Sequence, residues 1–140
     1  SPKDYFLLSL DRVKDKEVLE RAYDDTQGIT AKFNLNALKV LNDKLGANFN
    51  LNQFTHQAIY NDKDEQIEMY LISLQSQEIS FPTLSATIYL QEHEKILTEI
   101  SRKYTKLSIH RLLSKSGLIE HVHFEPDNEY FSLVLAKRTS

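Results

Sequence analysis

The spacing of apolar residues changes along the chain, and this change constrains the fold more than any other feature of the sequence. Over residues 16–45, apolar side chains recur three and four positions apart, which is typical of amphipathic helices. Over residues 54–75 they alternate with polar side chains, which is typical of half-buried strands. Separate helical and strand blocks predict a mixed α+β fold.

Two helices are predicted in the first block. The first begins after Asp15, which is a suitable N-cap. The second spans residues 30–45, with Thr30 as its N-cap and Gly46 just past its end. We expect one apolar stripe of this second helix to face the core. The residues of that stripe are Phe33, Ala37, Leu38, Leu41 and Leu45.

Two strand segments are predicted at the start and in the middle of the chain. The segment from Asp4 to Asp11 is a nearly continuous apolar run, the pattern of a strand covered on both faces in a parallel sheet. Residues 54–75 predict a hairpin around a polar turn, with Ile67, Met69 and Leu71 on one face.

The last third of the chain is expected to hold a second pair of strands, a helix and a final hairpin. The strand pair covers residues 85–101, although apolar residues spaced by four from Ile96 to Tyr104 leave a helical alternative for its end. The helix ends at Gly117, and two strands then flank a polar turn at residues 126–128.

Composition excludes several classes of function. The chain has 140 residues, which predicts one hydrophobic core, and its 41% hydrophobic content is too high for disorder. A net charge of −3 argues against nucleic-acid and anionic-lipid partners. The absence of cysteine excludes disulfides and thiolate metal sites. No apolar run is long enough to span a bilayer and no signal peptide is evident, so we expect a cytoplasmic protein without membrane contacts.

Several stretches of the sequence resemble those of one protein family. The closing helix and two strands resemble the C-terminus of Rossmann-like methyltransferases, in which the last strand inserts antiparallel. The stretches "LLSLDRVKDKEVLERAYDDTQGITAKFNLNALKVLNDKLGANF", "IYNDKDEQIEMYLIS" and "EKILTEISRKY" resemble the histidine-specific, S-adenosylmethionine-dependent methyltransferase family of ergothioneine biosynthesis, in order and in spacing. The resemblance implies a longer enzyme that transfers methyl groups in turn to the α-amine of L-histidine, forming trimethylhistidine (hercynine).

This resemblance also implies a domain organisation. The chain is expected to be the C-terminal portion of a Rossmann-like class I methyltransferase, with the N-terminal cofactor-binding half missing. Residues 1–14 and 105–140 would be the last elements of the methyltransferase domain, and residues 15–104 an inserted α+β domain that recognises the substrate.

The positions of the glycines agree with the expectation that the cofactor-binding half of the enzyme lies outside this chain. Binding of S-adenosylmethionine normally uses a glycine-rich turn after a strand, because only glycine lets the backbone approach so closely. The three glycines of this chain, Gly28, Gly46 and Gly117, each stand alone. We therefore expect the missing half to bind most of the cofactor, and the present portion to be inactive by itself.

Four residues are predicted to bind the substrate. By resemblance, Tyr23 contacts the carboxylate of L-histidine, while Glu99 and Ser101 hold its imidazole ring and Met69 lines the same pocket. In a strand, residues two apart project to the same side, roughly 6 to 7 Å apart, so Glu99 can accept a ring N–H while Ser101 bonds the other nitrogen. No catalytic side chain is predicted, because methyl transfer from a sulfonium needs positioning and no protein nucleophile.

Each of these residues also has a structural interpretation. Tyr23 would be an ordinary tyrosine at a helix end, Met69 a core residue, and Glu99 and Ser101 part of a solvated face. Asp24 and Asp25 are most simply a solvated turn, although they are also placed to orient the tyrosine or the loop that follows.

Two functional alternatives remain open at this stage. One is methylation of another amino acid such as a tryptophan derivative, which Glu99 disfavours because an indole offers one N–H and no ring acceptor. The other is an interaction domain without chemistry. We expect the full-length protein to be a monomer, and this portion to self-associate through exposed strand edges.

The histidines predict no metal site. His121 and His123 are two apart in a strand, a spacing that can chelate a metal, but the sequence places no third ligand beside them. His56, His93 and His110 are expected at the surface or at an interface.

Overall fold

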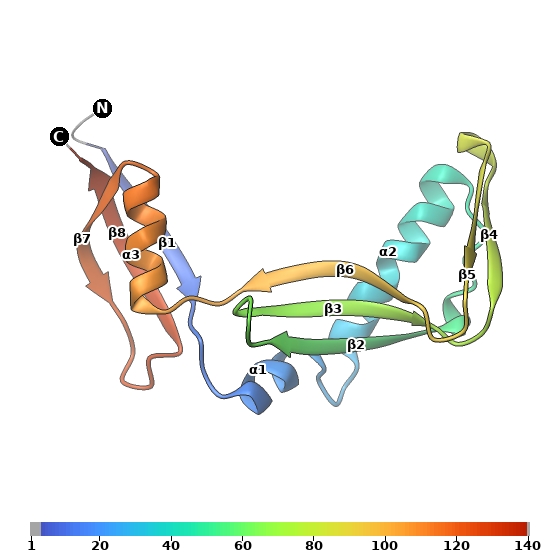
Figure 1. Cartoon of the computed structure of the whole chain (residues 1–140), viewed down its shortest axis with the longest axis horizontal. Helices are drawn as coiled ribbons and strands as arrows, with labels where there is room; N and C mark the ends of the chain where they lie inside the picture. The colour runs from blue at the N-terminus through green and yellow to red at the C-terminus, as the bar shows by residue number, and fades with distance from the viewer. Residues whose placement is uncertain (1–3, 140) are drawn as a thin grey trace. The chain divides into compact units, whose positions relative to one another are not determined.

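A computed structural model describes residues 4–139 and confirms the mixed α+β class (Figure 1). The described residues form three α-helices and eight strands, with two short 3₁₀ turns. In chain order the elements are β1 (Tyr5–Asp11), α1 (Lys16–Tyr23), α2 (Ile29–Leu45), η1 (Leu51–Gln53), β2 (Phe54–Asn61), β3 (Gln66–Ser73), β4 (Gln77–Phe81), η2 (Pro82–Leu84), β5 (Ala86–Leu90), β6 (Lys95–Arg102), α3 (Lys106–Lys115), β7 (Leu118–Phe124) and β8 (Phe131–Arg138).

The chain divides into two compact units. The first unit contains residues 4–15, the turn at residues 62–66, and residues 102–139. The second unit contains residues 16–61 and 67–101. Assignment of the first unit to a Rossmann-like domain, and of residues 15–104 to substrate recognition, stays a prediction. No helix among the described residues has both the length and the apolar character needed to cross a bilayer.

The first unit is a three-stranded sheet with one helix packed on it. The last strand, β8, lies between β1 and β7 and runs antiparallel to both, as the resemblance implied for the closing strand. A buried cluster joins the sheet to α3: Leu10, Val134 and Ala136 come from the sheet, and Ile109 and Leu113 from the helix.

The prediction that β1 is covered on both faces in a parallel sheet is wrong for this chain. Its partner β8 is antiparallel, and β1 forms an edge of its sheet. Tyr5, Phe6 and Leu7 are each more than half exposed, since the described residues put only α3 against this sheet. The strand itself was predicted correctly, but a continuous apolar run does not reveal which neighbours cover it.

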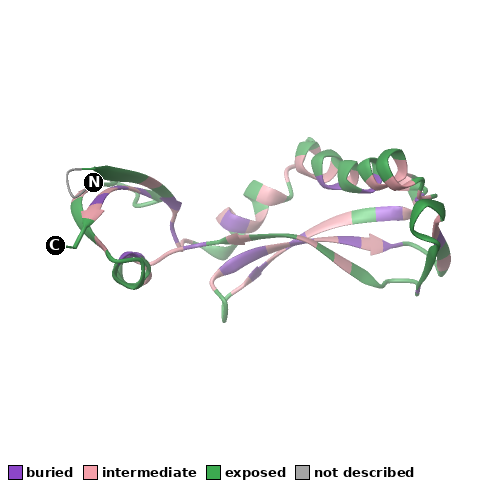
Figure 2. Ribbon diagram, turned by 90° about the horizontal axis from the view of Figure 1, so that it is seen from above, coloured by how far each residue is buried: buried purple, intermediate pink, exposed green. Residues whose placement is uncertain are grey.

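The second unit is a sheet with both of its helices on one side. The strand order is β2-β3-β6. Along β3, Ile67, Met69 and Leu71 all point to one face, as the alternation predicted. Leu19 of α1 packs with Ile67 and Met69, while Leu38 of α2 packs in the cluster that contains Leu71. Figure 2 shows both helices over the same side of this sheet.

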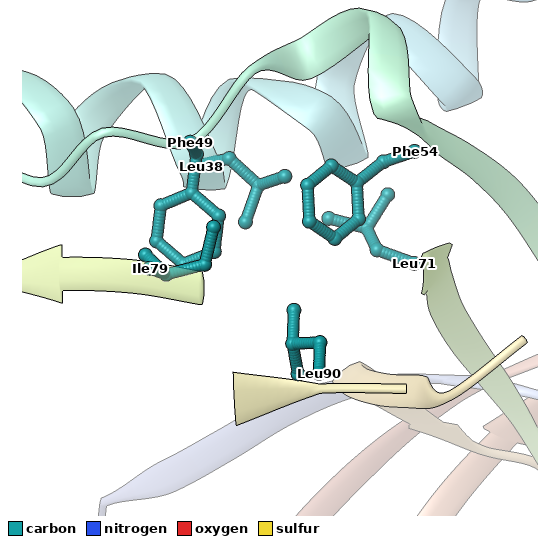
Figure 3. Close-up of a cluster of buried hydrophobic side chains, with 6 residues drawn as sticks. All are labelled: Leu38, Phe49, Phe54, Leu71, Ile79 and Leu90. Carbon is teal, nitrogen blue, oxygen red and sulfur yellow. The ribbon is translucent and has the colours of Figure 1, made fainter. Parts of the chain in front are cut away.

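A second hairpin closes the core beyond the end of α2. Strands β4 and β5 pair with each other, and Ile79 and Leu90 carry the cluster of buried side chains onto this hairpin (Figure 3). The ring of Phe49 meets the rings of Phe54 and Phe81 edge to face, at centroid distances of 5.8 and 5.7 Å. Such pairs stabilise a core beyond the area that they bury.

The predicted strand pair over residues 85–101 does exist as two strands, but they do not pair with each other. β5 pairs with β4, and β6 pairs with β3 in the other sheet. The helical alternative for the end of this segment is also wrong, because the strand continues to Arg102. The local sequence pattern predicted both strands correctly. Which strands they pair with depends on contacts between residues far apart in the chain.

Glycines flank the second helix, α2, with Gly28 as its N-cap and Gly46 as its C-cap. Gly46 takes a left-handed conformation at the C-cap, and its N–H donates to the carbonyl of Asn42, as predicted. The predicted N-cap, Thr30, is wrong: the carboxylate of Asp25 accepts hydrogen bonds from the backbone N–H groups of Ile29 and Thr30 instead.

The buried face of α2 differs from the predicted stripe. Phe33 is 66% exposed and Ala37 is also exposed, whereas Asn34 and Leu38 are buried. Asn34 can occupy a core position because its side-chain amide finds hydrogen-bond partners there. Phe33 is thereby left on the surface of the helix, next to strand β6.

Candidate substrate site

Two predicted substrate residues meet in the second unit. Tyr23 is the last residue of α1, and its hydroxyl lies 2.8 Å from Oγ of Ser101 on β6. Either hydroxyl can donate in this bond. Both side chains are partly buried, so they are held in place while part of each faces solvent.

Glu99 lies two residues before Ser101 on the same strand. Residues two apart in a strand project to the same side, so both side chains share one side of β6. Glu99 is exposed and borders a hollow of about 230 Å³ between β6 and α2. The side chains that line this hollow are Phe33, Asn34, Asn36, Ala37, Thr98 and Glu99.

This hollow combines a carboxylate with an aromatic wall. Phe33 supplies an exposed ring, Asn36 a side-chain amide, and Glu99 a negative charge. Such a mixture suits a small, flat, polar group that can stack on a ring and donate a hydrogen bond. Leu97, which is 47% exposed, borders a second hollow that Glu99 shares.

Met69 lies beneath this site. Its side chain is 2% exposed and packs in a cluster with Leu19, Ala58, Tyr60 and Ile67. Tyr23 packs against the same cluster. Met69 therefore contributes to the apolar support of the tyrosine, and direct contact of Met69 with a substrate stays a prediction.

The sequence analysis missed three residues that surround these groups. Asn34 and His56 are hydrogen-bonded to each other, and His56 also bonds the backbone carbonyl of Tyr23. His56 was expected at the surface or at an interface and is partly buried, whereas Phe33 was expected in the core and is exposed. One sequence feature could have indicated them: Asn34 is a polar residue four positions before Leu38, and therefore on the same face of the helix as a predicted core residue.

Asp24 and Asp25 have different environments. Asp24 is exposed. Asp25 accepts two backbone N–H groups at the start of α2, and the bonds from Thr30 and then Ile29 lower its pKa from about 3.8 to about 2. Asp25 thus orders the loop between Tyr23 and α2, which was one of the two roles expected for these carboxylates.

Charged side chains also gather in the first unit, where they pair with one another. Lys103 is 1% exposed and forms an ion pair of 2.8 Å with Asp11. Burial acts to raise the pKa of the Asp11 carboxyl, but hydrogen bonds from Lys103 and Lys14 outweigh it and hold that pKa below its usual value.

The two histidines of β7 contact different groups. His121 packs on the ring of Tyr5 at 5.0 Å, whereas His123 donates to Glu120 and bonds Oγ of Ser132. In the part of the chain that the structure describes, no three histidine, aspartate or glutamate side chains lie close enough to hold a metal ion.

Comparison with known proteins supplies an independent observation. A family model described as histidine-specific methyltransferase, SAM-dependent, matches residues 1–138. A histidine N-alpha-methyltransferase of Mycolicibacterium smegmatis is 39% identical over 98% of this chain and 43% of its own length. One from Mycobacterium tuberculosis is 40% identical over 84% of this chain and 36% of its own length. Ergothioneine biosynthesis protein 1 of Neurospora crassa is 27% identical over 97% of this chain and 15% of its own length. The chain thus spans less than half the length of these relatives.

Proposed function

The chain belongs to the histidine-specific, S-adenosylmethionine-dependent methyltransferase family, and on that premise we propose that it forms the amino-acid pocket of an enzyme that methylates the α-amine of L-histidine. The single observation that carries this proposal is the hydrogen bond between Tyr23 and Ser101, two residues along β6 from Glu99, which borders an open hollow. The second unit would recognise the amino acid, and the first would belong to a Rossmann-like methyltransferase domain.

The proposed role of these residues is binding and alignment. Methyl transfer to an amine needs a neutral nitrogen held in line, and no protein nucleophile, so orientation carries most of the rate enhancement that a protein can supply. An amino acid offers its carboxylate and its side chain as handles. Tyr23 would hold the carboxylate, and Glu99 with Ser101 would hold the imidazole.

Each handle matches the chemistry of its proposed partner. A carboxylate such as that of Glu99 only accepts hydrogen bonds, so it selects a ring that donates an N–H. The hydroxyl of Ser101 donates or accepts, so it suits the second ring nitrogen. The exposed ring of Phe33 would cover one face of the imidazole.

The residues described here do not fit S-adenosylmethionine. Gly28 precedes α2, Gly46 ends it, and Gly117 follows α3, so none belongs to a glycine-rich turn after a strand. An added Cβ would meet nothing within 4 Å at Gly28 or Gly117, so no close backbone approach requires glycine there. We propose that the family's cofactor binds mainly to the N-terminal half of the longer enzyme, and that this chain alone is inactive.

Calorimetric titration of L-histidine into the full-length protein, with S-adenosylhomocysteine present, tests the proposal. Glu99→Ala should weaken binding by about 1 to 3 kcal/mol, the usual scale for loss of a charged hydrogen bond. Glu78→Ala, which removes an exposed carboxylate from β4, is the matched control and should change nothing. Absence of histidine binding, or binding that ignores Glu99, would refute the proposal. Tighter binding of L-tryptophan than of L-histidine would favour the other amino-acid substrate.

A further inference from the structure

His56 joins three elements of the second unit through its imidazole ring. Its Nε2 lies 2.8 Å from the backbone carbonyl oxygen of Tyr23, at the end of α1. Its Nδ1 lies 2.9 Å from Nδ2 of Asn34, on α2. The ring itself projects from β2 and is partly buried. Both ring nitrogens of His56 are therefore engaged by atoms that the helices supply.

These contacts determine which nitrogen carries the proton. A carbonyl oxygen can only accept, so Nε2 of His56 must donate to Tyr23. In the neutral ring Nδ1 is then an acceptor, and the amide of Asn34 donates to it. The other hydrogen of the same amide has its own acceptor, the backbone carbonyl oxygen of Tyr70 at 3.2 Å. Every donor in this chain of bonds has one acceptor only when His56 is the neutral Nε2–H tautomer.

The hydrogen bond from His56 to Tyr23 satisfies a backbone carbonyl at the end of a helix. The last carbonyls of an α-helix have no intrahelical partner, and Tyr23 is the final residue of α1. His56 satisfies this carbonyl and ties the end of α1 to β2. The side chain of the same tyrosine lies against the Met69 cluster, with its hydroxyl on Ser101. The backbone and the ring of Tyr23 are thus held at separate points.

Asn34 connects this arrangement with the hollow. It is 3% exposed, yet it is one of the side chains that border the cavity beside Glu99. A buried amide that loses its partners costs the full penalty of desolvation, so Asn34 has one well-defined orientation. The same side chain therefore reaches both parts of the proposed pocket: it bonds His56 at the tyrosine end, and together with Glu99 it borders the hollow at the ring end.

We propose that His56 and Asn34 are positioning residues of the substrate pocket, which hold the Tyr23 hydroxyl where the carboxylate of the amino acid must arrive. This inference rests on the proposed function. Neither residue touches the reacting atoms. Their effect passes through Tyr23, so it should appear as a change in the KM for L-histidine and should depend on the Tyr23 hydroxyl.

Two conservative substitutions separate the two ring nitrogens. The side-chain amide of glutamine can place a donor where Nε2 of the histidine lies, whereas that of asparagine reaches only the Nδ1 position. In the full-length enzyme, His56→Gln should keep the KM for L-histidine within about threefold of wild type, whereas His56→Asn should raise it about tenfold, the usual equivalent of one lost hydrogen bond. kcat should change less than KM in both variants.

A matched control distinguishes positioning from general loss of stability. Asn42 also lies in α2 and makes two hydrogen bonds, with the backbone N–H and carbonyl of Phe49. Asn42→Leu and Asn34→Leu should lower the melting temperature to a similar extent, but only Asn34→Leu should raise the KM for L-histidine. Equal effects on KM would overturn the inference.

Dependence on Tyr23 gives a second and stricter test. In a Tyr23→Phe background, His56→Asn should raise KM no further, because the hydroxyl that it positions is already gone. Additive effects would contradict the inference. A ¹⁵N spectrum of the imidazole rings supplies a readout that needs no activity: His56 should show a protonated Nε2 and a bare Nδ1, and the opposite tautomer would also overturn it.

Failure of this inference can be told apart from failure of the proposed function. If Glu99→Ala and Tyr23→Phe weaken histidine binding while the substitutions at His56 and Asn34 do not, only the positioning role is wrong. If Glu99→Ala also leaves binding unchanged, the substrate assignment itself is wrong.

Discussion

The hydroxyl of Tyr23 lies 2.8 Å from Oγ of Ser101, although 78 residues separate the two in the chain. This bond joins the end of α1 to an edge strand of the sheet. Each hydroxyl gives the other a hydrogen-bond partner, so neither of these two partly buried polar groups depends on solvent alone. A bound amino acid would exchange this bond for new ones.

Removal of the Ser101 hydroxyl should weaken binding of L-histidine to the full-length protein. Ser101→Ala is expected to cost about 0.5 to 1.5 kcal/mol, the scale of a neutral hydrogen bond. Because Tyr23 and Ser101 bond to each other, their effects should not be additive. The loss of binding free energy in the double variant, Tyr23→Phe with Ser101→Ala, should differ from the sum of the losses in the two single variants. Calorimetry measures all four states, and Ser114→Ala in α3 is the control. Strict additivity would mean that the two hydroxyls do not act together.

Phe33→Ala should separate binding from stability. The ring is 66% exposed, so its loss should leave the melting temperature nearly unchanged. It should nevertheless weaken histidine binding several-fold if the ring covers the imidazole. Tyr89→Ala removes another ring, 71% exposed on β5, and should affect neither property. A large drop in the melting temperature of Phe33→Ala would show that the ring belongs to the core after all.

Asp25→Ala should destabilise the chain in a manner that depends on pH. The pKa of Asp25 is lowered to about 2, so its stabilising bonds are fully present above pH 3.8 and are lost as pH falls through 2. The difference in urea midpoint between wild type and Asp25→Ala should therefore be largest near neutral pH and shrink in acid. Asp24→Ala removes the same charge from the neighbouring residue. An equal effect of that control would assign the change to charge and not to capping.

Loss of the ion pair between Asp11 and Lys103 should lower the free energy of unfolding strongly only when the buried ammonium group of Lys103 remains. Asp11→Ala leaves the charge of Lys103 buried and should lower the free energy of unfolding by about 2 to 4 kcal/mol. This range is set below that of fully enclosed pairs, because 37% of the Asp11 side chain remains exposed. Lys103→Met removes the buried charge itself and should cost much less. Urea unfolding of both variants checks the order, and the reverse order would refute it.

Truncation in the core of the second unit should give the largest loss of stability. Leu71 is fully buried in the cluster of Figure 3, so Leu71→Ala should cost about 2 to 5 kcal/mol. Val40→Ala, on the exposed side of α2, should cost far less, because Val40 is 46% exposed. Similar losses for the two variants in urea unfolding would contradict the core assignment.

Local sequence patterns predicted the elements well where the cause of an element is local. The glycine that ends α2 and the alternation of β3 depend only on neighbouring residues, and both were found as predicted. The extended spacing of Glu99 and Ser101 also follows from strand geometry, which the structure of β6 supports. These parts of the site could be read from the sequence.

The errors arose where distant partners decide the outcome. Phe33 is apolar and Asn34 is polar, so the sequence favoured Phe33 as the buried residue. The reverse holds because His56 and the carbonyl of Tyr70 satisfy the amide of Asn34. Likewise, the cover of β1 and the pairing of β5 and β6 depend on residues far along the chain. A single sequence carries no record of such partners.

The pairing of β1 with β8 has a consequence for the order of folding. Tyr5 pairs with Lys137 and Asp11 with Phe131, so this sheet joins residues from opposite ends of the chain. Closing so long a loop costs entropy before the strands gain any contact. The second unit lies between these ends and finds its core within residues 16–101. During synthesis β1 therefore emerges before β8 and must wait for it, while the residues of the second unit emerge between the two strands and can fold in that interval.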